Sequence, residues 1–381
     1  MIPLAIPNLS GNEARYLQEC VETNFVSSVG PFVTRFEAMV AEAAGAPCAV
    51  ATSAGTTGLH AALTAVGVRR DDLVILPSMT FIASANSIAH CGAQPWLLDI
   101  SGESWTLDPE QLARVLAAET TRRDGEVLHR ATGRRVAAVM PVYTLGMPAD
   151  MDAIMETTRA YGLPVVADGA AALGARYKGR AIGALGADLT VFSFNGNKTV
   201  TAGGGGAVLG ADEALCARVR HLTTTARRGA EYDHDMVGFN YRMTNLQAAV
   251  GCAQLEQLEH FVAVKRRIAR AYTEALGTLP GVGLFPHPGW AEGACWLGGV
   301  TLNMPPLSEV IPRLREAGVD ARPFWKPVHL QVPYAHVPRA PLPVSDRVWR
   351  TILTLPCSTS LTQQEQETVI AAVHSAVRSE R

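Results

Sequence analysis

Short apolar runs alternate with segments of helical spacing between residues 48 and 210. The runs are rich in β-branched residues and have the length of buried strands, a pattern typical of a parallel sheet flanked by helices. We expect strands at 48–52, 73–76, 95–98, 136–140, 164–167, 189–194 and 206–209, and helices at 56–66 and 82–91. Asp108-Pro109-Glu110 predicts another helix start, because it joins an N-cap acid to a proline at the first helical position. The predicted fold class is α/β.

The pattern changes after residue 244. Helical spacing continues from 245 to about 276, and a smaller α+β module follows, with a strand expected at 296–302 and helices at 307–317 and 363–377. We therefore expect a large domain over 1–258 and a small C-terminal domain over 259–381. The basic tract 119–135 is interpreted as a solvated connection between a helix and a strand rather than as a phosphate-binding patch.

Composition and charge narrow the classes of function. The chain has 381 residues, of which 48% are hydrophobic and 18% charged, and its formal net charge is -2. This balance argues against a disordered protein and against nucleic acid as a partner. The uncharged stretches 43–68 and 73–98 are too often interrupted by glycine, proline and polar residues to span a membrane. Because the chain also lacks the cationic start of a secretory signal, we expect a cytoplasmic protein with no membrane partner.

Seven cysteines are scattered along the chain. Their odd number and the lack of a C-x-x-C pair argue against a disulfide framework and against a zinc ribbon. We expect most of them to be small buried side chains, and we expect no metal site.

Three polar features follow predicted strands, where ligands gather in open α/β sheets. The small-residue turn 52–58 can hold a phosphate at a helix start, although it can also be an ordinary turn. Asp168 ends the run 164–167 and can bind a metal, act as a base, pair with a protonated ring nitrogen or simply cap a turn. Lys198 follows the run that ends near Ser193 and precedes four glycines, so it is a candidate imine-forming amine or a solvated loop lysine.

Together these features are the anchors that pyridoxal phosphate requires: a phosphate cradle, an acid for the ring nitrogen and an imine-forming lysine. Phe81, which follows another predicted strand, is a candidate for stacking on the pyridine ring, and a core position is the competing interpretation.

Several motifs resemble one family over almost the whole chain, from Ile6 to about Leu361. They lie at 27–30 (SSVG), 51–56 (ATSAGT), 77–86, 192–206 and 238–245 (GFNYRMTN). They resemble the DegT-type, pyridoxal-phosphate-dependent nucleotide-sugar aminotransferases of the aspartate-aminotransferase fold. The sequence of these motifs is most similar to the branch that aminates 4-keto-6-deoxy sugars for legionaminic acid, bacillosamine and perosamine. The resemblance implies a mainly parallel central sheet, glutamate as amino donor, ping-pong kinetics and a homodimer with shared active sites.

The resemblance also implies roles for individual residues. Lys198 matches the lysine that bonds the cofactor, and Asp168 matches the partner of the pyridine nitrogen. The remaining cofactor-binding positions are Gly55, Thr56 and Ser193 for the phosphate, Phe81 for stacking, and Asn240, which reaches the phosphate of the neighbouring subunit's cofactor. The implied substrate-binding positions are Ser28, Tyr143, Arg242 and His329, and the stretch 321–329 resembles a small-domain segment that borders the substrate pocket.

Two departures from the family pattern leave alternatives open. Ala171 stands where the family has Glu, Gln or His, and Tyr143 stands where it has His. A pyridoxal phosphate enzyme of secondary metabolism acting on another keto sugar, cyclitol or carbonyl therefore stays possible. A related dehydratase typically has histidine at the position of Lys198, which argues against that reaction. A non-catalytic sensor or regulatory protein that keeps the fold is the alternative from another class.

Overall fold

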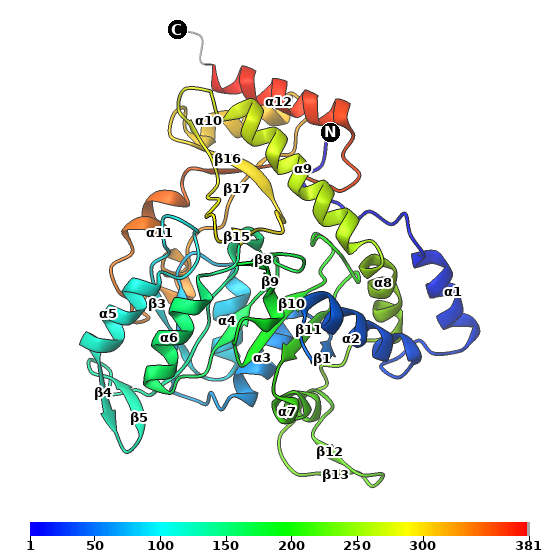
Figure 1. Cartoon of the computed structure of the whole chain (residues 1–381), viewed down its shortest axis with the longest axis vertical. Helices are drawn as coiled ribbons and strands as arrows, with labels where there is room; N and C mark the ends of the chain where they lie inside the picture. Colours follow the sequence, from blue (N-terminus) through cyan, green and yellow to red (C-terminus); the bar gives the residue numbers. More distant parts are fainter. Residues whose placement is uncertain (379–381) are drawn as a thin grey trace.

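The computed structural model describes residues 1–378 and is built around a seven-stranded sheet in the large domain (Figure 1). Its strands run in the spatial order β1 (Cys48–Thr52), β11 (Gly206–Gly210), β10 (Leu189–Ser193), β7 (Val166–Asp168), β6 (Val136–Val139), β2 (Leu73–Pro77) and β3 (Gln94–Leu98). A parallel bridge between Val139 and Val165 joins the two halves of the sheet. Only β11 runs antiparallel to its neighbours among these strands. The expected α/β class is confirmed, and each expected strand is present with small shifts at its ends.

Helices cover both faces of this sheet, which explains why its strands are continuous apolar runs. Leu73 and Ile75 point into one core, and Val74 and Leu76 point into the other, because successive strand side chains alternate between the faces. The first face is covered by α2 (Pro31–Ala44), α5 (Pro109–Glu119), α6 (Met151–Tyr161) and α8 (Asn245–Leu255), and the second by α3 (Gly55–Ala65), α4 (Ile82–His90) and α7 (Glu213–Thr223). Helix α1 (Glu13–Glu22) packs on α8.

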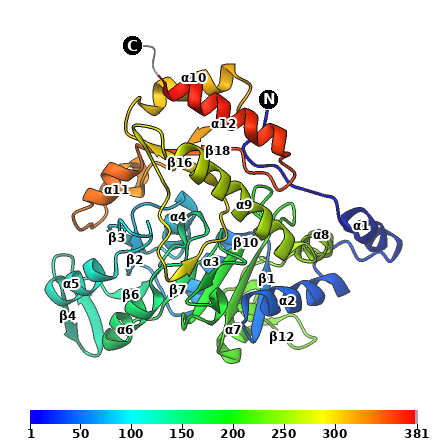
Figure 2. The same ribbon diagram turned by 45° about the horizontal axis from the view of Figure 1, so that its top comes forward.

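The smaller domain has its own antiparallel sheet and core (Figure 2). The sheet order is β14 (Val282–Gly283), β16 (Gly298–Leu302), β18 (Ile352–Leu355) and β17 (Arg322–Pro323), with α9 (Leu258–Leu276), α10 (Leu307–Glu316) and α12 (Gln363–Val377) beside it. The expected boundary at 258/259 falls at the start of α9, which supplies Phe261 to the large core and Ile268 to the small one. Val328 and Tyr334 return to the large domain's core.

The remaining elements are short. They are the hairpin β4 (Thr120–Arg123) and β5 (Glu126–His129), the three-stranded sheet β15 (Ala291–Glu292), β8 (Arg176–Tyr177) and β9 (Arg180–Ala181), the hairpin β12 (Arg227–Arg228) and β13 (Asp233–His234) below α7, helix α11 (Pro343–Val348), and 3-10 turns at Thr144–Gly146, Ile182–Ala184, Val328–Leu330 and Val332–Tyr334 (Figure 1). The tract 119–135, expected to be a plain connection, instead contains the first of these hairpins. The expected N-cap of α5 is confirmed, since the Asp108 carboxylate accepts the amides of Glu110 and Gln111.

The expectation about cysteines is wrong for one pair. Cys48 and Cys216 form a disulfide across 168 residues of sequence, from the start of β1 to α7. Spacing along the chain carries no sign of this pair, because the sheet and not the local sequence brings the two residues together. The other five cysteines are free thiols.

Neither a membrane span nor a metal cluster occurs within residues 1–378. None of the helices in this range has the length and apolar character that a bilayer crossing requires. The same range contains no group of three or more His, Cys, Asp or Glu side chains arranged to hold a metal ion.

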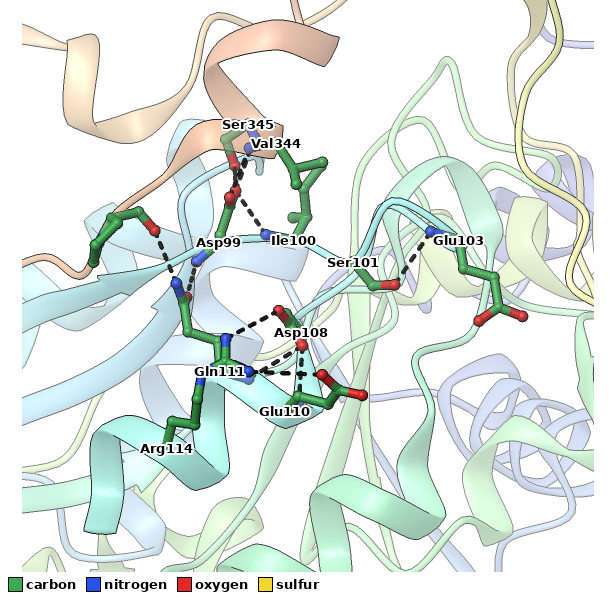
Figure 3. A network of polar contacts seen from close by, with 11 residues as sticks. Asp99, Ile100, Ser101, Glu103, Asp108, Glu110, Gln111, Arg114, Val344 and Ser345 are labelled. Carbon is green, nitrogen blue, oxygen red and sulfur yellow. Dashed lines mark hydrogen bonds and ion pairs between the residues drawn. The ribbon is translucent and has the colours of Figure 1, made fainter. Parts of the chain in front are cut away.

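A buried carboxylate ties the small domain to the large one (Figure 3). Asp99 follows β3 and is 3% exposed. Its carboxylate accepts the Val344 amide at 2.7 Å, the Ser345 amide at 2.8 Å and the Ser345 hydroxyl at 2.6 Å. Gln111 accepts the Asp99 amide and donates to the Pro341 carbonyl. The chain at 341–345, where α11 begins, is therefore fixed to the edge of the large sheet.

We predict that Asp99→Asn lowers the free energy of unfolding by about 2 kcal/mol, because an amide cannot accept all these donors and leaves some of them buried without a partner. Urea denaturation measures the change. Glu110→Gln is the matched control, since the Glu110 side chain is 86% exposed and its change should stay below about 0.5 kcal/mol. Equal losses in the two variants would contradict the proposed anchor.

Candidate active site

A cavity of about 260 Å³ lies where the carboxyl ends of the parallel strands meet. Strands β1, β2, β6, β7 and β10 all point to this edge, so the loops that follow them converge there. The small domain closes the cavity with Trp296 and Trp325. Of the residues expected from the sequence, the lining contains Gly55, Thr56, Phe81, Tyr143, Asp168, Ser193 and Lys198.

Asp168 is a buried carboxylate at the end of β7, with 5% of its surface exposed. The Ser84 hydroxyl donates to it at 2.7 Å and the Ala170 amide at 3.0 Å. Burial raises the pKa of Asp168, although these donors and the nearby Lys198 favour the charged form. A carboxylate held this way is suited to pair with a cationic ring nitrogen.

Lys198 extends into the same cavity from the turn after β10. Its Nζ lies 3.9 Å from the centroid of the Trp296 ring. Burial lowers the pKa of Lys198 to about 8, while the charge of Asp168 acts in the opposite direction. An appreciable fraction of this lysine is therefore unprotonated near neutral pH, as a nucleophilic amine or a proton carrier requires.

The predicted phosphate cradle consists of the start of α3 and the end of β10. The first amides of a helix have no partner within the helix and favour an anion. A Cβ at Gly55 would lie 2.9 Å from Ser193 Cβ, and one at Gly206 would lie 2.6 Å from the Ala54 carbonyl oxygen. Glycine at these two positions lets the turns pack closely and leaves the helix amides open to the cavity. The donor set thus fits a phosphorylated pyridine aldehyde.

Aromatic side chains form the opposite wall. Phe81 is 50% exposed and lies 5.2 Å from Trp325, measured between ring centroids. Trp325 lies 5.6 Å from Trp296. Neither tryptophan is among the single site residues predicted from the sequence. Trp325 does lie in the stretch 321–329, which the family resemblance predicted to border the substrate pocket.

Two neighbouring hydroxyls in the lining have no partner. Tyr143 Oη and Thr144 Oγ1 are buried and make no hydrogen bond within residues 1–378. Burial raises the pKa of Tyr143, so its phenol stays protonated at neutral pH. Ala171 lies in the same lining, and its methyl side chain adds no polar group to the cavity.

Four predicted site residues lie outside the cavity lining of this chain: Ser28, Asn240, Arg242 and His329. Asn240 is exposed, and Arg242 pairs through its backbone with Thr52, next to the phosphate turn. Ser28 is half-buried in the loop before α2. A single chain therefore does not bring these side chains to Lys198.

His329 has a different setting from the one expected. Its side chain is buried, with Nδ1 2.7 Å from Ser78 Oγ and Nε2 3.0 Å from Asp346 Oδ1. These contacts connect the end of β2 to α11 and leave Trp325, four residues earlier, as the side chain of this stretch that lines the cavity. In this chain His329 joins the segment that follows Trp325 to the end of β2.

The model of the DegT/DnrJ/EryC1/StrS aminotransferase family matches residues 7–374. The chain is 38% identical to the GDP-perosamine synthase of Caulobacter vibrioides, covering 98% of this chain and 97% of that protein. It is 36% identical to the putative pyridoxal phosphate-dependent aminotransferase EpsN of Bacillus subtilis, with 97% and 94% covered. A crystal structure of a DegT DnrJ EryC1 StrS aminotransferase from Brucella abortus superposes with a TM-score of 0.89 at 27% identity, covering 97% of this chain and 96% of that one.

The chain belongs to the DegT/DnrJ/EryC1/StrS aminotransferase family. It is an aminotransferase, and the expected fold and the expected cofactor, pyridoxal phosphate, are confirmed. The roles of single residues stay predictions.

We predict that Asp168→Asn leaves the cofactor-free protein at least as stable at pH 7. The folded pKa of Asp168 is raised, so ionising it costs stability once the pH exceeds its unfolded value, and the amide removes that cost. Affinity for pyridoxal phosphate should fall about tenfold, because the ring nitrogen loses its charged partner. Thermal melting and cofactor titration measure the two effects.

Asp72→Asn is the matched control. Asp72 is also buried, but it binds Arg135 away from the cavity. Its loss should lower the melting temperature and spare cofactor affinity. If Asp168→Asn behaved in the same way as this control, Asp168 would be a structural carboxylate.

Proposed function

We propose that this chain moves the amino group of glutamate to a nucleotide-linked 4-keto-6-deoxy sugar, by a ping-pong mechanism, for surface polysaccharide or nonulosonic acid biosynthesis. The observation that carries this proposal is the convergence of Lys198, Asp168 and the phosphate turn on one cavity. The near full-length similarity to a GDP-perosamine synthase supports the class of substrate. We also propose that the enzyme works in the cytoplasm.

Pyridoxal phosphate, when bound, supplies an aldehyde that takes up amino groups and a ring that withdraws electrons. The residues that would hold it are Lys198 at the aldehyde, Asp168 at the ring nitrogen, Phe81 at the ring face, and the phosphate cradle of Gly55, Thr56 and Ser193.

Lys198 is also the group that takes the proton from the α-carbon of the amino donor and later returns it. Its amine is inside the cavity and its pKa is lowered to about 8, so it can both accept and return a proton near neutral pH. Among the titratable side chains of the lining, Asp168 is assigned to the ring nitrogen and Tyr143 stays protonated. This leaves Lys198 as the base.

The cofactor and the proposed substrates are anionic, and one chain lines the cavity with few cations. A cofactor phosphate, glutamate and a nucleotide diphosphate are all anions, and within residues 1–378 Lys198 is the only cation that lines the cavity. We propose that a second copy of the chain completes the site with Asn240 and Arg242, which lie outside their own cavity. Ser28 is in a loop whose Ser27 carbonyl accepts the Asn245 amide, so we place it on the same surface. Tyr143 is the proposed substrate contact from within the chain.

A two-stage experiment tests the reaction. We predict that the loaded enzyme, incubated with glutamate and then freed of it by gel filtration, aminates a nucleotide-linked 4-keto-6-deoxy sugar to about one product per active site. Lys198→Ala should give no product, because it lacks the amine that moves the proton. Mass spectrometry of the sugar product is the measurement. Amination of only a cyclitol or another carbonyl in the same test would overturn the substrate class.

Mixing two inactive variants tests the shared site. We predict that Lys198→Ala and Arg242→Ala, each nearly inactive alone, recover about one quarter of native activity when co-refolded, since half of the dimers are mixed and carry one intact site. Sites built from a single chain would give no recovery.

A further inference from the structure

Trp296 makes two contacts with the turn that carries Lys198, and neither has a role in the mechanism proposed above. Its indole Nε1 donates to the carbonyl oxygen of Asn197 at 2.7 Å. Its ring lies beneath the lysine amine, 3.9 Å from Nζ to the ring centroid. Trp296 comes from the small domain, two residues before β16, whereas Lys198 follows β10 of the large domain.

The tryptophan is itself held firmly. It is 3% exposed and belongs to the small domain's core. Its amide donates to the Leu145 carbonyl at 3.2 Å, and its carbonyl accepts the buried ammonium of Lys265 at 3.0 Å. The Cys357 thiol lies 3.6 Å from the same carbonyl. A side chain anchored at both its amide and its carbonyl can impose a position on a neighbour.

Lys198 has little else to hold it. Within residues 1–378 its Nζ has no hydrogen-bond or ion-pair partner, so the ring of Trp296 is the contact that orients the amine. The bond to Asn197 fixes the peptide immediately before the lysine. A cation is attracted to the face of an indole ring, so the same contact favours the ammonium form against the effect of burial.

We propose that Trp296 is a positioning residue for Lys198: the indole N–H fixes the peptide that precedes the lysine, and the ring face holds the amine inside the cavity. The proposal rests on the proposed role of Lys198. In this proposal the small domain contributes to the site by positioning Lys198 as well as by forming part of the aromatic wall.

Two substitutions separate the two contacts. Trp296→Phe keeps an aromatic face and loses the N–H, and Trp296→Leu loses both. The reactivity of Lys198 toward acetic anhydride is measured against pH in the cofactor-free protein by peptide mass mapping. The other titratable groups that face this region are Asp168 and Tyr143 in the cavity and Lys265 and Cys357 behind the tryptophan, and all stay unchanged in these variants.

We expect Trp296→Leu to move the labelling profile to lower pH by about half a unit to one unit, because the ammonium loses the ring while burial persists. Trp296→Phe should move it by less than half as much. In the enzyme loaded with pyridoxal phosphate, Trp296→Phe should lower kcat about tenfold with little change in KM, since the lysine is misplaced while the aromatic wall remains. If the leucine variant does not fold, Trp296→Met replaces it.

Trp349→Phe is the matched control. Its indole Nε1 is buried without a partner among residues 1–378, so the same atoms are removed without loss of a hydrogen bond. Labelling and kcat should match the native protein. Unchanged labelling in Trp296→Leu together with native kcat in Trp296→Phe would overturn the proposal.

Protection of Lys198 by the cofactor distinguishes the proposed role of Lys198 from the proposed role of Trp296. Pyridoxal phosphate should shield Lys198 from the reagent in the native protein. Absence of shielding would overturn the proposed role of Lys198 itself. If the cofactor shields Lys198 but the Trp296 variants keep the native labelling profile, the positioning role alone would be overturned.

Discussion

The site depends on two opposite charges, Lys198 and Asp168, that lie in one cavity without an ion-pair partner for either among residues 1–378. Burial makes each charge costly, and the attraction between them offsets only part of that cost. The remainder appears as a lowered pKa for the lysine and a raised one for the carboxylate. Such a pair is suited to a ligand that brings an aldehyde to the amine and a cationic nitrogen to the acid, which are the roles that we propose for Lys198 and Asp168.

The parallel sheet makes this arrangement possible, and it also decides how much of the site the sequence could predict. Runs such as 73–76 and 189–194 indicated the strands. Because the carboxyl ends of parallel strands meet at one edge, the sequence alone was enough to place Asp168 and Lys198 together. The phosphate turn at Gly55 was predictable for the same reason. The pairing of Cys48 with Cys216 was not, since it depends on the distance between β1 and α7 in space.

The sequence predicted only part of the small domain's contribution, the stretch 321–329, and gave no sign of Trp296. Long-range contacts hold the small domain beside the cavity: Asp99 fixes residues 344–345, and His329 joins Ser78 to Asp346. Each of these contacts links residues more than a dozen positions apart, beyond the range of turn or helix patterns. The family resemblance placed His329 near the substrate, and only the structure shows that its side chain bonds Ser78 and Asp346 outside the cavity lining. Asn240 and Arg242 pose the converse case, because one chain shows them outside the cavity that they are proposed to complete.

The most direct test of the proposed site is to find where the cofactor attaches. The protein is loaded with pyridoxal phosphate, reduced with borohydride and digested, and the peptides are mapped by mass spectrometry. We predict that the reduced cofactor is on Lys198 and that the label disappears in Lys198→Ala. A label on another lysine, such as the buried Lys265, or no covalent label at all, would contradict the central role given to Lys198.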